Sequence, residues 1–154
     1  MRIMLALLFA AEISAAAVPP ATQWAREEFE RCAAEVFGKA PPVSFALPGD
    51  TADFSDDFAA LKDTDGYAVR RRGDSIVFVA DCSKGHVNGV HRWLERNSDI
   101  IWPRPMGDMC FFTPREAGIS SLDCDYRDVP AFRLRFLALF QVTVDVKSTW
   151  DMSI

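Results

Sequence analysis

The segment from Gly66 to Pro103 constrains the fold more than any other part of this chain. Alternation of apolar and polar residues over 67–72 predicts a β-strand, and the apolar run over 75–80 predicts a second strand that is covered on both faces. Between them lies Arg72-Gly73-Asp74, a turn signal because glycine readily adopts positive φ. The segment therefore predicts a β-hairpin, and the turn accounts for the Arg-Gly-Asp triplet without an adhesion function.

A helix is expected directly after this hairpin, with Ser83 as its N-cap residue. One apolar face is formed by residues at helical spacing, namely Val87, Val90, His91 and Leu94. Gly85 and Gly89 share a side of this helix, where each glycine costs roughly 1 kcal/mol. We therefore expect the two glycines to permit close packing of the helix backbone on the sheet. The segment contains neither a P-loop nor a GxGxxG pattern, so phosphate binding is not expected.

The remaining elements alternate between helix and strand. An amphipathic helix is expected over 22–37, followed by Gly38 as a C-terminal cap. Further expected elements are a strand over 43–47, a helical turn over 58–61, short strands over 100–102, 109–113 and 119–122, and a strand over 131–146. Because helices and strands interleave, the sequence predicts an α/β (α+β) fold, a two-layer sandwich in which helices pack on one face of a small mixed β-sheet.

The first seventeen residues have the pattern of a signal peptide. Arg2 supplies the positive charge, an apolar run follows, and Ala15 and Ala17 form a cleavage site before Val18. The run is shorter than the roughly 20 residues of a membrane span. We therefore predict a secreted or periplasmic protein without a membrane span. Its domain would cover residues 18–135, and residues 136–154 would be the truncated start of a following domain or a tail.

Charge and cysteine content narrow the possible partners. The net charge of −5 disfavours nucleic-acid binding, which usually requires a basic surface. Four cysteines remain after the signal peptide, and they are either buried thiols or disulfides with three possible connectivities. They match no zinc-binding spacing, so no metal and no cofactor are expected. These residues are Cys32, Cys82, Cys110 and Cys124.

Few residues suggest chemistry by their pattern. Asp123, Asp125 and Asp128 are clustered, which could suggest acid/base or calcium chemistry, but they lack the spacing of an EF-hand loop. Solvated loop charges are the expected reading. His86 and His91 are five residues apart, so they point to different sides of the predicted helix and are expected to pack rather than to ligate. No catalytic, metal-binding or cofactor-binding residue is assigned.

The block GYAVRRRGDSIVFVADCSKGHVNGVHRWLER, followed by IIWPRP, resembles the N-terminal domain of secreted glycoside hydrolases. The closest groups are α-glucuronidases and family-20 β-N-acetylhexosaminidases. The later segment DYRDVPAFRLR resembles the strand that leads those enzymes into their catalytic barrel. The resemblance covers about residues 22–135, and His91 departs from it where an aromatic residue such as tyrosine is usual. The matching positions are Gly66, Tyr67, Gly73, Asp74, Ile76, Ser83, Gly85, Gly89, Val90, Trp93, Leu94, Glu95, Trp102 and Pro105.

This resemblance implies an accessory domain, a β-sheet with helices on one side, packed against a catalytic (β/α)8 barrel. The acid/base carboxylates of those enzymes lie on the barrel, so none can be transferred to this chain. A barrel needs about 250 residues, whereas nineteen residues follow Arg135. We therefore expect a non-catalytic fragment of a carbohydrate-degrading hydrolase. Whether the chain has activity of its own stays open.

Two alternatives remain from the sequence. A stand-alone carbohydrate-binding module could use tryptophans to stack on sugars, the candidates being Trp24, Trp93, Trp102 and Trp150. An independent enzyme would need a nucleophile and a base within hydrogen-bonding reach, and the sequence offers no such constellation. The apolar stretch from Phe132 to Phe140 is expected to lie at the barrel-facing surface, which predicts poor solubility for the isolated chain.

Overall fold

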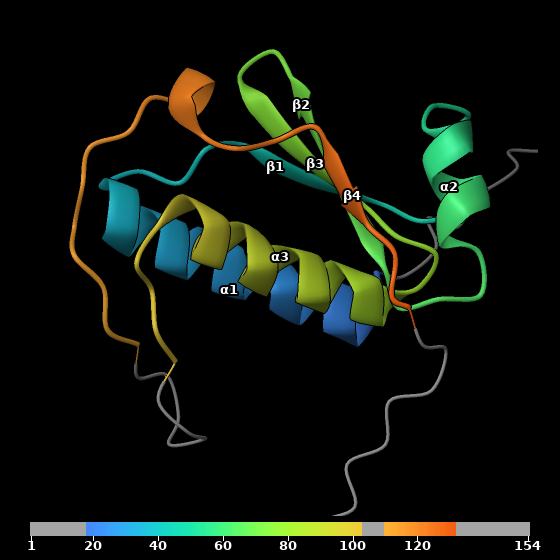
Figure 1. Ribbon diagram of the computed structural model, residues 1–154, viewed down its shortest axis with the longest axis horizontal. Helices are drawn as coiled ribbons and strands as arrows, with labels where there is room; N and C mark the ends of the chain where they lie inside the picture. Colours follow the sequence, from blue (N-terminus) through green and yellow to red (C-terminus); the bar gives the residue numbers. More distant parts are fainter. Residues whose placement is uncertain (1–17, 103–109, 132–154) are drawn as a thin grey trace, which may run out of the picture.

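The computed structural model describes residues 18–102 and 110–131, and this part of the chain is a mixed β-sheet with its covering helices (Figure 1). The order of elements is α1 (Pro20–Phe37), β1 (Val43–Ala46), α2 (Ser55–Leu61), β2 (Tyr67–Arg72), β3 (Ser75–Val79), α3 (Ser83–Asn97), a short 3-10 helix (Ile119–Ser121) and β4 (Tyr126–Asp128). The expected signal peptide, the strand expected over 131–146 and the tail over 136–154 lie almost wholly or entirely outside the described residues.

The sheet has four strands in the order β1-β3-β2-β4 within the described residues. The predicted hairpin is confirmed, because β2 and β3 pair antiparallel and Gly73 occupies the turn at a φ of 57°. Strand β1 adds to β3 in parallel, and β4 pairs antiparallel with the other edge of β2. The sheet is therefore mixed, as the sequence predicted.

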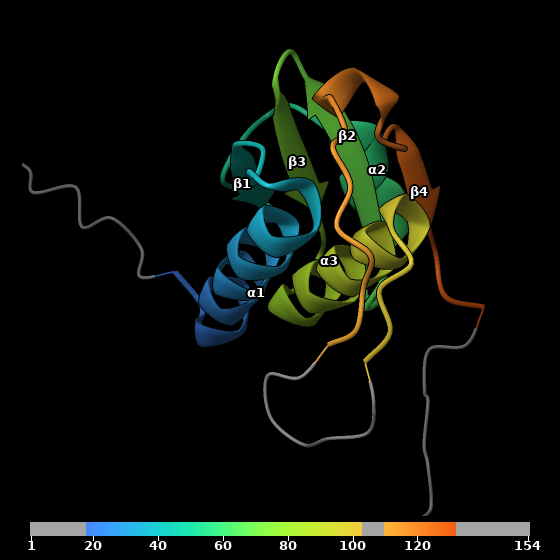
Figure 2. The same cartoon turned by 90° about the vertical axis from the view of Figure 1, so that its left-hand side faces the viewer.

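The two faces of the sheet are covered unequally. Ile76 and Phe78 of β3 belong to the main core under α1 and α3, whereas Val77 and Val79 belong to a smaller cluster on the other face. Figure 2 shows the two long helices side by side against one face and the short α2 behind the sheet. The predicted fold class is confirmed. Helix α2, which contains the helical turn predicted over 58–61, adds cover on the second face, in agreement with the apolar run of β3.

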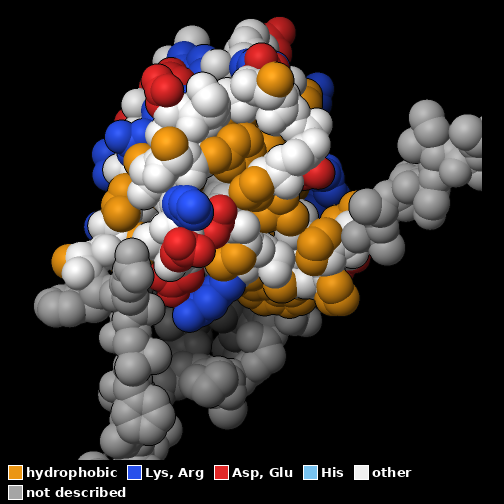
Figure 3. Space-filling view, turned by 90° about the vertical axis from the view of Figure 1, so that its right-hand side faces the viewer, with side chains coloured by type: hydrophobic (Ala, Val, Ile, Leu, Met, Phe, Trp, Pro, Cys, Tyr) orange, Lys and Arg blue, Asp and Glu red, His pale blue; other side chains and the backbone are white. Residues whose placement is uncertain are grey.

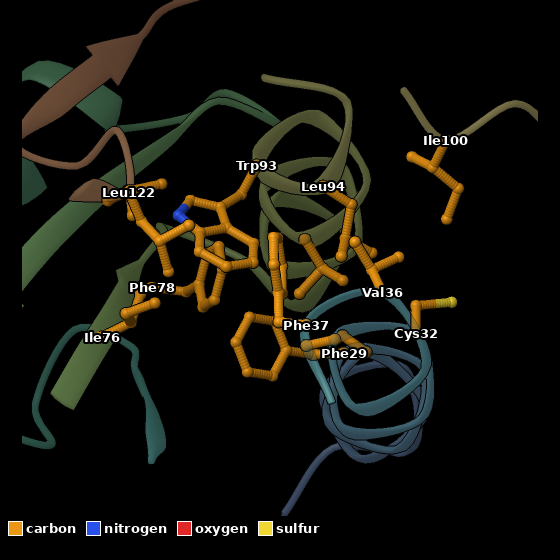
Figure 4. Packing of buried hydrophobic residues seen from close by; sticks show 14 of the residues in the cluster. Phe29, Cys32, Val36, Phe37, Ile76, Phe78, Trp93, Leu94, Ile100 and Leu122 are labelled. Atoms are coloured by element: carbon orange, nitrogen blue, oxygen red, sulfur yellow. The ribbon is translucent and has the colours of Figure 1, made fainter. Parts of the chain in front are cut away.

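The main core is built around aromatic side chains (Figure 4). Trp93 of α3 lies 5.1 Å from Phe29 and 5.8 Å from Phe37 between ring centroids, and Phe29 lies 5.6 Å from Phe78 of the sheet. Phe29, Phe78 and Trp93 are fully buried. These rings join α1, α3 and β3 into one packed unit, which is why both long helices stay on the same face.

Helix α1 follows the sequence prediction closely. Its buried residues include Ala25, Phe29 and Cys32, which lie on the expected apolar stripe. Gly38 ends the helix in the left-handed conformation at a φ of 75°, as expected for a C-terminal cap. The helix begins at Pro20, slightly before the expected start, because proline is well accommodated in the first helical turn.

The glycines of α3 lie where helix and sheet approach most closely. A Cβ atom at Gly85 would overlap the carbonyl oxygen of Gly66 and lie 2.7 Å from the Cβ of Ala80. A Cβ atom at Gly89 would lie 3.1 Å from Phe78 and 3.2 Å from Tyr67. The prediction that these glycines allow close backbone packing is therefore confirmed.

Three local predictions were wrong or incomplete. Cys82, in an extended conformation, is the N-cap of α3, so Ser83 is already helical and its hydroxyl caps nothing. The segment over 119–122 is a 3-10 helix rather than a strand, because Ser121 and Leu122 turn back to bond Gly118 and Ile119. Only a single bridge, between Ile101 and Phe111, represents the strands expected over 100–102 and 109–113 in the described chain.

Within residues 18–102 and 110–131, no helix combines the length and the apolar character that crossing a bilayer requires.

Candidate functional site

The three clustered aspartates are separated by the fold. Asp123 pairs with Arg96, Asp125 accepts a hydrogen bond from the backbone of Arg71, and Asp128 accepts one from the Tyr67 hydroxyl. Among the residues that the structure describes, no group of three His, Cys, Asp or Glu side chains could hold a metal ion. The three aspartates are exposed, as predicted, and each one bonds to a different residue, in α3 for Asp123 and in β2 for Asp125 and Asp128.

His86 is a structural residue in the core. Its Nε2 lies 3.1 Å from the carbonyl oxygen of Ala46, and its Nδ1 lies 2.9 Å from Oγ1 of Thr22. Since a carbonyl can only accept, Nε2 carries the proton and Nδ1 accepts from the threonine hydroxyl. Burial lowers the pKa of His86 to about 4, so the ring is neutral at physiological pH. The histidine joins α3 to α1 and β1.

His91 lies on a different side of α3 and stacks on two tryptophans. Its ring centroid is 5.7 Å from that of Trp24 and 4.7 Å from that of Trp102. Burial lowers the pKa of His91, and its Nε2 has no hydrogen-bond partner within the described chain. The expectation that both histidines pack rather than ligate agrees with these contacts.

The tryptophans proposed as sugar platforms lie in different environments. Trp93 is fully buried in the main core, which removes it from any surface role. Trp24 is 45% exposed, while Trp102 is half-buried and packs on the core. Trp150 lies outside the described residues. Trp24 is therefore the one exposed tryptophan among those the structure describes, and its ring also stacks on His91.

A polar site that the sequence did not indicate lies on the face of the sheet under α2. The carboxylate of Asp57 accepts hydrogen bonds from Arg70, at 2.8 Å from Nε and 2.6 Å from Nη2. Nη1 of Arg127 also donates to this carboxylate, at 3.2 Å. Its side chain is 6% exposed. These side chains, with Phe54, Ser55 and Asp56, line a hollow of about 440 Å³.

The alternation of the sheet explains this site. Arg70 lies on the predicted polar face of β2, and Arg127 belongs to the neighbouring strand, β4. Asp57 lies in the first turn of α2, which begins three residues before the helical turn predicted over 58–61. The sequence shows three consecutive arginines at the end of β2. It gives no signal that a carboxylate thirteen residues earlier would fold back over Arg70.

A second polar hollow, of about 380 Å³, lies beside α3 on the opposite face of the sheet. The Tyr67 hydroxyl donates to Oδ2 of Asp128 at 3.3 Å. Burial, with the charge of Asp128, raises the pKa of Tyr67, so the phenol keeps its proton. The other side chains at this hollow are Val87, Asn88, His91, Arg92 and Glu95. The hollow offers hydrogen-bond donors and acceptors, but no activated nucleophile.

Apolar side chains are also found near the surface. On the side of the molecule where α2 lies, hydrophobic side chains gather between charged groups (Figure 3). Phe54 and Phe58 pack there against the smaller cluster of the sheet while remaining partly exposed. Val129, directly after β4, is 44% exposed. This side of the domain therefore combines apolar side chains with the paired charges around Asp57.

Comparison with known proteins adds no assignment. No protein-family model matches this chain, and no curated protein and no solved structure is significantly similar to it.

Proposed function

We propose that this chain is the non-catalytic N-terminal accessory domain of a secreted, carbohydrate-degrading glycoside hydrolase of the α-glucuronidase or β-N-acetylhexosaminidase type. One observation carries the proposal. The motif positions that resemble those enzymes, Gly66, Tyr67, Gly85 and Gly89, meet at the contact between α3 and the sheet. These motif residues therefore serve the packing of α3 on the sheet. A purely structural function of this kind is expected of a supporting domain.

The path of the chain after β4 supports this reading. A Cβ atom at Gly66 would lie 2.7 Å from the carbonyl oxygen of Asp128, 2.8 Å from Pro130 and 2.9 Å from Leu61. The segment that resembles the entry into a barrel thus leaves the sheet beside the end of α2. We propose that the side bearing α2 and Val129 faces the catalytic domain.

The first test concerns the gene. Reading the DNA beyond codon 154 is expected to show a barrel, either in frame or displaced by a frameshift. An intact unrelated gene, together with a purified chain that stays a soluble monomer in sizing chromatography, would contradict the proposal.

A second test measures docking directly. The encoded barrel, expressed separately, is expected to co-elute with the mature chain and to have glycosidase activity that the chain alone lacks. Val129→Asp is expected to weaken co-elution, since it places a charge beside the proposed interface. Ile101→Asp, a similar change at an exposed aliphatic residue, serves as the control because the segment around residues 100–102 lies at the end of the domain opposite α2 (Figure 1). Equal co-elution of both variants would contradict the proposed face.

The cellular location is part of the same proposal. Expression of the full precursor in a bacterial host is expected to yield a secreted or periplasmic protein whose N-terminus is Val18. Retention of the uncleaved precursor in the cytoplasm would contradict export.

A carbohydrate-binding module is the second candidate. It is favoured by the polar hollow beside α3, where Tyr67, Asn88 and Arg92 could contact sugar hydroxyls. Calorimetric titration with hexosamine and uronic-acid oligomers would detect such binding. Heat of binding that Arg92→Ala abolishes would support a module, and no heat with any oligomer would remove this candidate.

A further inference from the structure

The fold brings two cysteines that are distant in sequence to the same ion pair. Glu28 and Arg31 of α1 are joined by hydrogen bonds of 2.8 Å. Sγ of Cys32 donates to Oε1 of Glu28 at 3.4 Å, and Nη1 of Arg31 lies 4.0 Å from Sγ of Cys110. Each thiol thus contacts one member of a single ion pair, although Cys110 comes from the segment that follows residues 103–109.

Packing also places these two residues together. Cys32 is fully buried on α1, and Cys110 is a half-buried member of the side chains that pack against the same core cluster. Cys110 is close enough to Cys32 for its charge to contribute to the raised pKa of the Cys32 thiol. The other two thiols have different neighbours, since Cys82 contacts the carbonyl oxygen of Thr64 and Cys124 lies next to Tyr126.

We propose that Cys32 and Cys110 form a disulfide under oxidising conditions, and that this bond fastens the segment beginning at Cys110 to α1. Four cysteines offer six possible single pairs, and the structure favours the one that joins Cys32 to Cys110, with Cys82 and Cys124 left as thiols. The two cysteines form a site of covalent modification, and this proposal does not depend on the proposed accessory function.

The oxidant is a small disulfide such as oxidised glutathione, acting by thiol–disulfide exchange. Cys110 reacts first because it is partly accessible, whereas Cys32 is fully buried. Its sulfur attacks the small disulfide, forms a mixed disulfide and expels one glutathione thiolate. Cys32 then attacks the sulfur of Cys110 and expels the second glutathione. The protein loses two S–H bonds and gains one S–S bond, while the oxidant takes up two electrons and two protons as two glutathione thiols.

The second step is expected to be the slow one. Burial and the neighbouring charge of Glu28 raise the pKa of Cys32, which disfavours the attacking thiolate. The mixed disulfide at Cys110 should therefore accumulate before the internal bond forms. Replacing the carboxylate, as in Glu28→Gln, is expected to shorten the lifetime of this intermediate.

The test is peptide mass mapping of the purified mature chain after incubation with oxidised glutathione, without reduction. The expected result is a cross-linked pair of peptides that contain Cys32 and Cys110, with the other two thiols open to alkylation. Cys110→Ser is expected to lose the linkage and Cys124→Ser to keep it, with circular dichroism as the check that both fold. A linkage that involves Cys82 or Cys124, or four thiols that all remain open to alkylation, would overturn the proposal.

A thermal measurement separates a stabilising bond from an incidental one. Oxidised wild-type protein is expected to unfold several degrees above the reduced protein, because the bond closes a long loop of the unfolded chain. The shift should vanish in Cys110→Ser and persist in Cys124→Ser. An oxidised wild-type protein that melts at or below the temperature of the reduced one would contradict the fastening role.

Discussion

The carboxylate of Asp57 accepts two hydrogen bonds from the guanidinium of Arg70, and this contact fastens α2 to the sheet. The two residues come from a short helix and a central strand, and Arg127 of β4 adds a third donor at 3.2 Å. The position of α2 depends on this pairing and on the apolar side chains beneath the helix, which pack against Leu61 and Phe58.

Replacement of Asp57 by asparagine is expected to lower the free energy of unfolding by about 3 kcal/mol, because a neutral amide then stands between two arginines whose charges it does not balance. Urea denaturation measures the change. Asp53→Asn is the matched control, since Asp53 also pairs with an arginine of β2 but in an exposed position, and it is expected to have little effect. Equal losses in both variants would contradict the special role of Asp57.

Alanine at position 85 is expected to destabilise the protein by about 2 kcal/mol, although alanine normally favours a helix over glycine. The added methyl group has no room between Gly66 and Ala80. Gly118→Ala introduces the same methyl group where the nearest atom is 3.8 Å away, so its stability should stay near that of the wild type. Chemical denaturation of both variants decides, and a stabilised Gly85→Ala protein would refute the close contact.

His86 predicts a pH dependence of stability. Its pKa is about 4 in the folded chain, because burial disfavours the charged ring, whereas an unfolded histidine titrates near 6.5. Between these values the unfolded state binds more protons, so stability is expected to fall as the pH drops from about 6.5 to about 4. Above pH 6.5 the histidine contributes no slope.

The variant His86→Gln isolates this contribution from other titrating groups. The difference in unfolding free energy between wild type and variant is expected to change by up to about 3 kcal/mol across this window. Denaturation at a series of pH values measures it. A difference that is constant with pH would show that the ring is not held neutral in the fold.

The tryptophans are expected to differ sharply in their effect on stability. Trp93→Ala should cost about 3–5 kcal/mol, since it empties the centre of the aromatic core. Trp24→Ala removes a ring that is 45% exposed and should cost much less. Thermal unfolding of the two variants compares them, and similar melting temperatures would contradict the core position of Trp93.

The features predicted correctly from sequence are those that follow from local pattern. The hairpin could be recognised because Gly73 combines with strand alternation on both sides. The close packing at Gly85 and Gly89 could be inferred because glycine inside a helix requires a reason. Helix α1 has a regular apolar stripe that ends at Gly38, and this combination is readily recognised.

The features that were missed depend on contacts between distant segments. Asp57 looks like any surface acid until the fold places it over Arg70. Serine is a residue type that commonly caps helices, so Ser83 was the expected N-cap. The helix instead begins at Ser83, and the extended N-cap residue is Cys82. The sequence likewise indicates neither that β1 runs parallel to β3 nor that Cys110 returns to α1.

The position of β4 has a consequence for the order of assembly. Strands β2 and β3 and helix α3 follow one another directly, so they can come together as soon as they leave the ribosome. Strand pairing between Val69 and Tyr126 can form only later, because Tyr126 is synthesised after α3 and the long connection that follows it. Until then the edge of β2 offers unpaired backbone groups to any neighbouring strand. A newly made chain that is released early is therefore most exposed to aggregation at this edge.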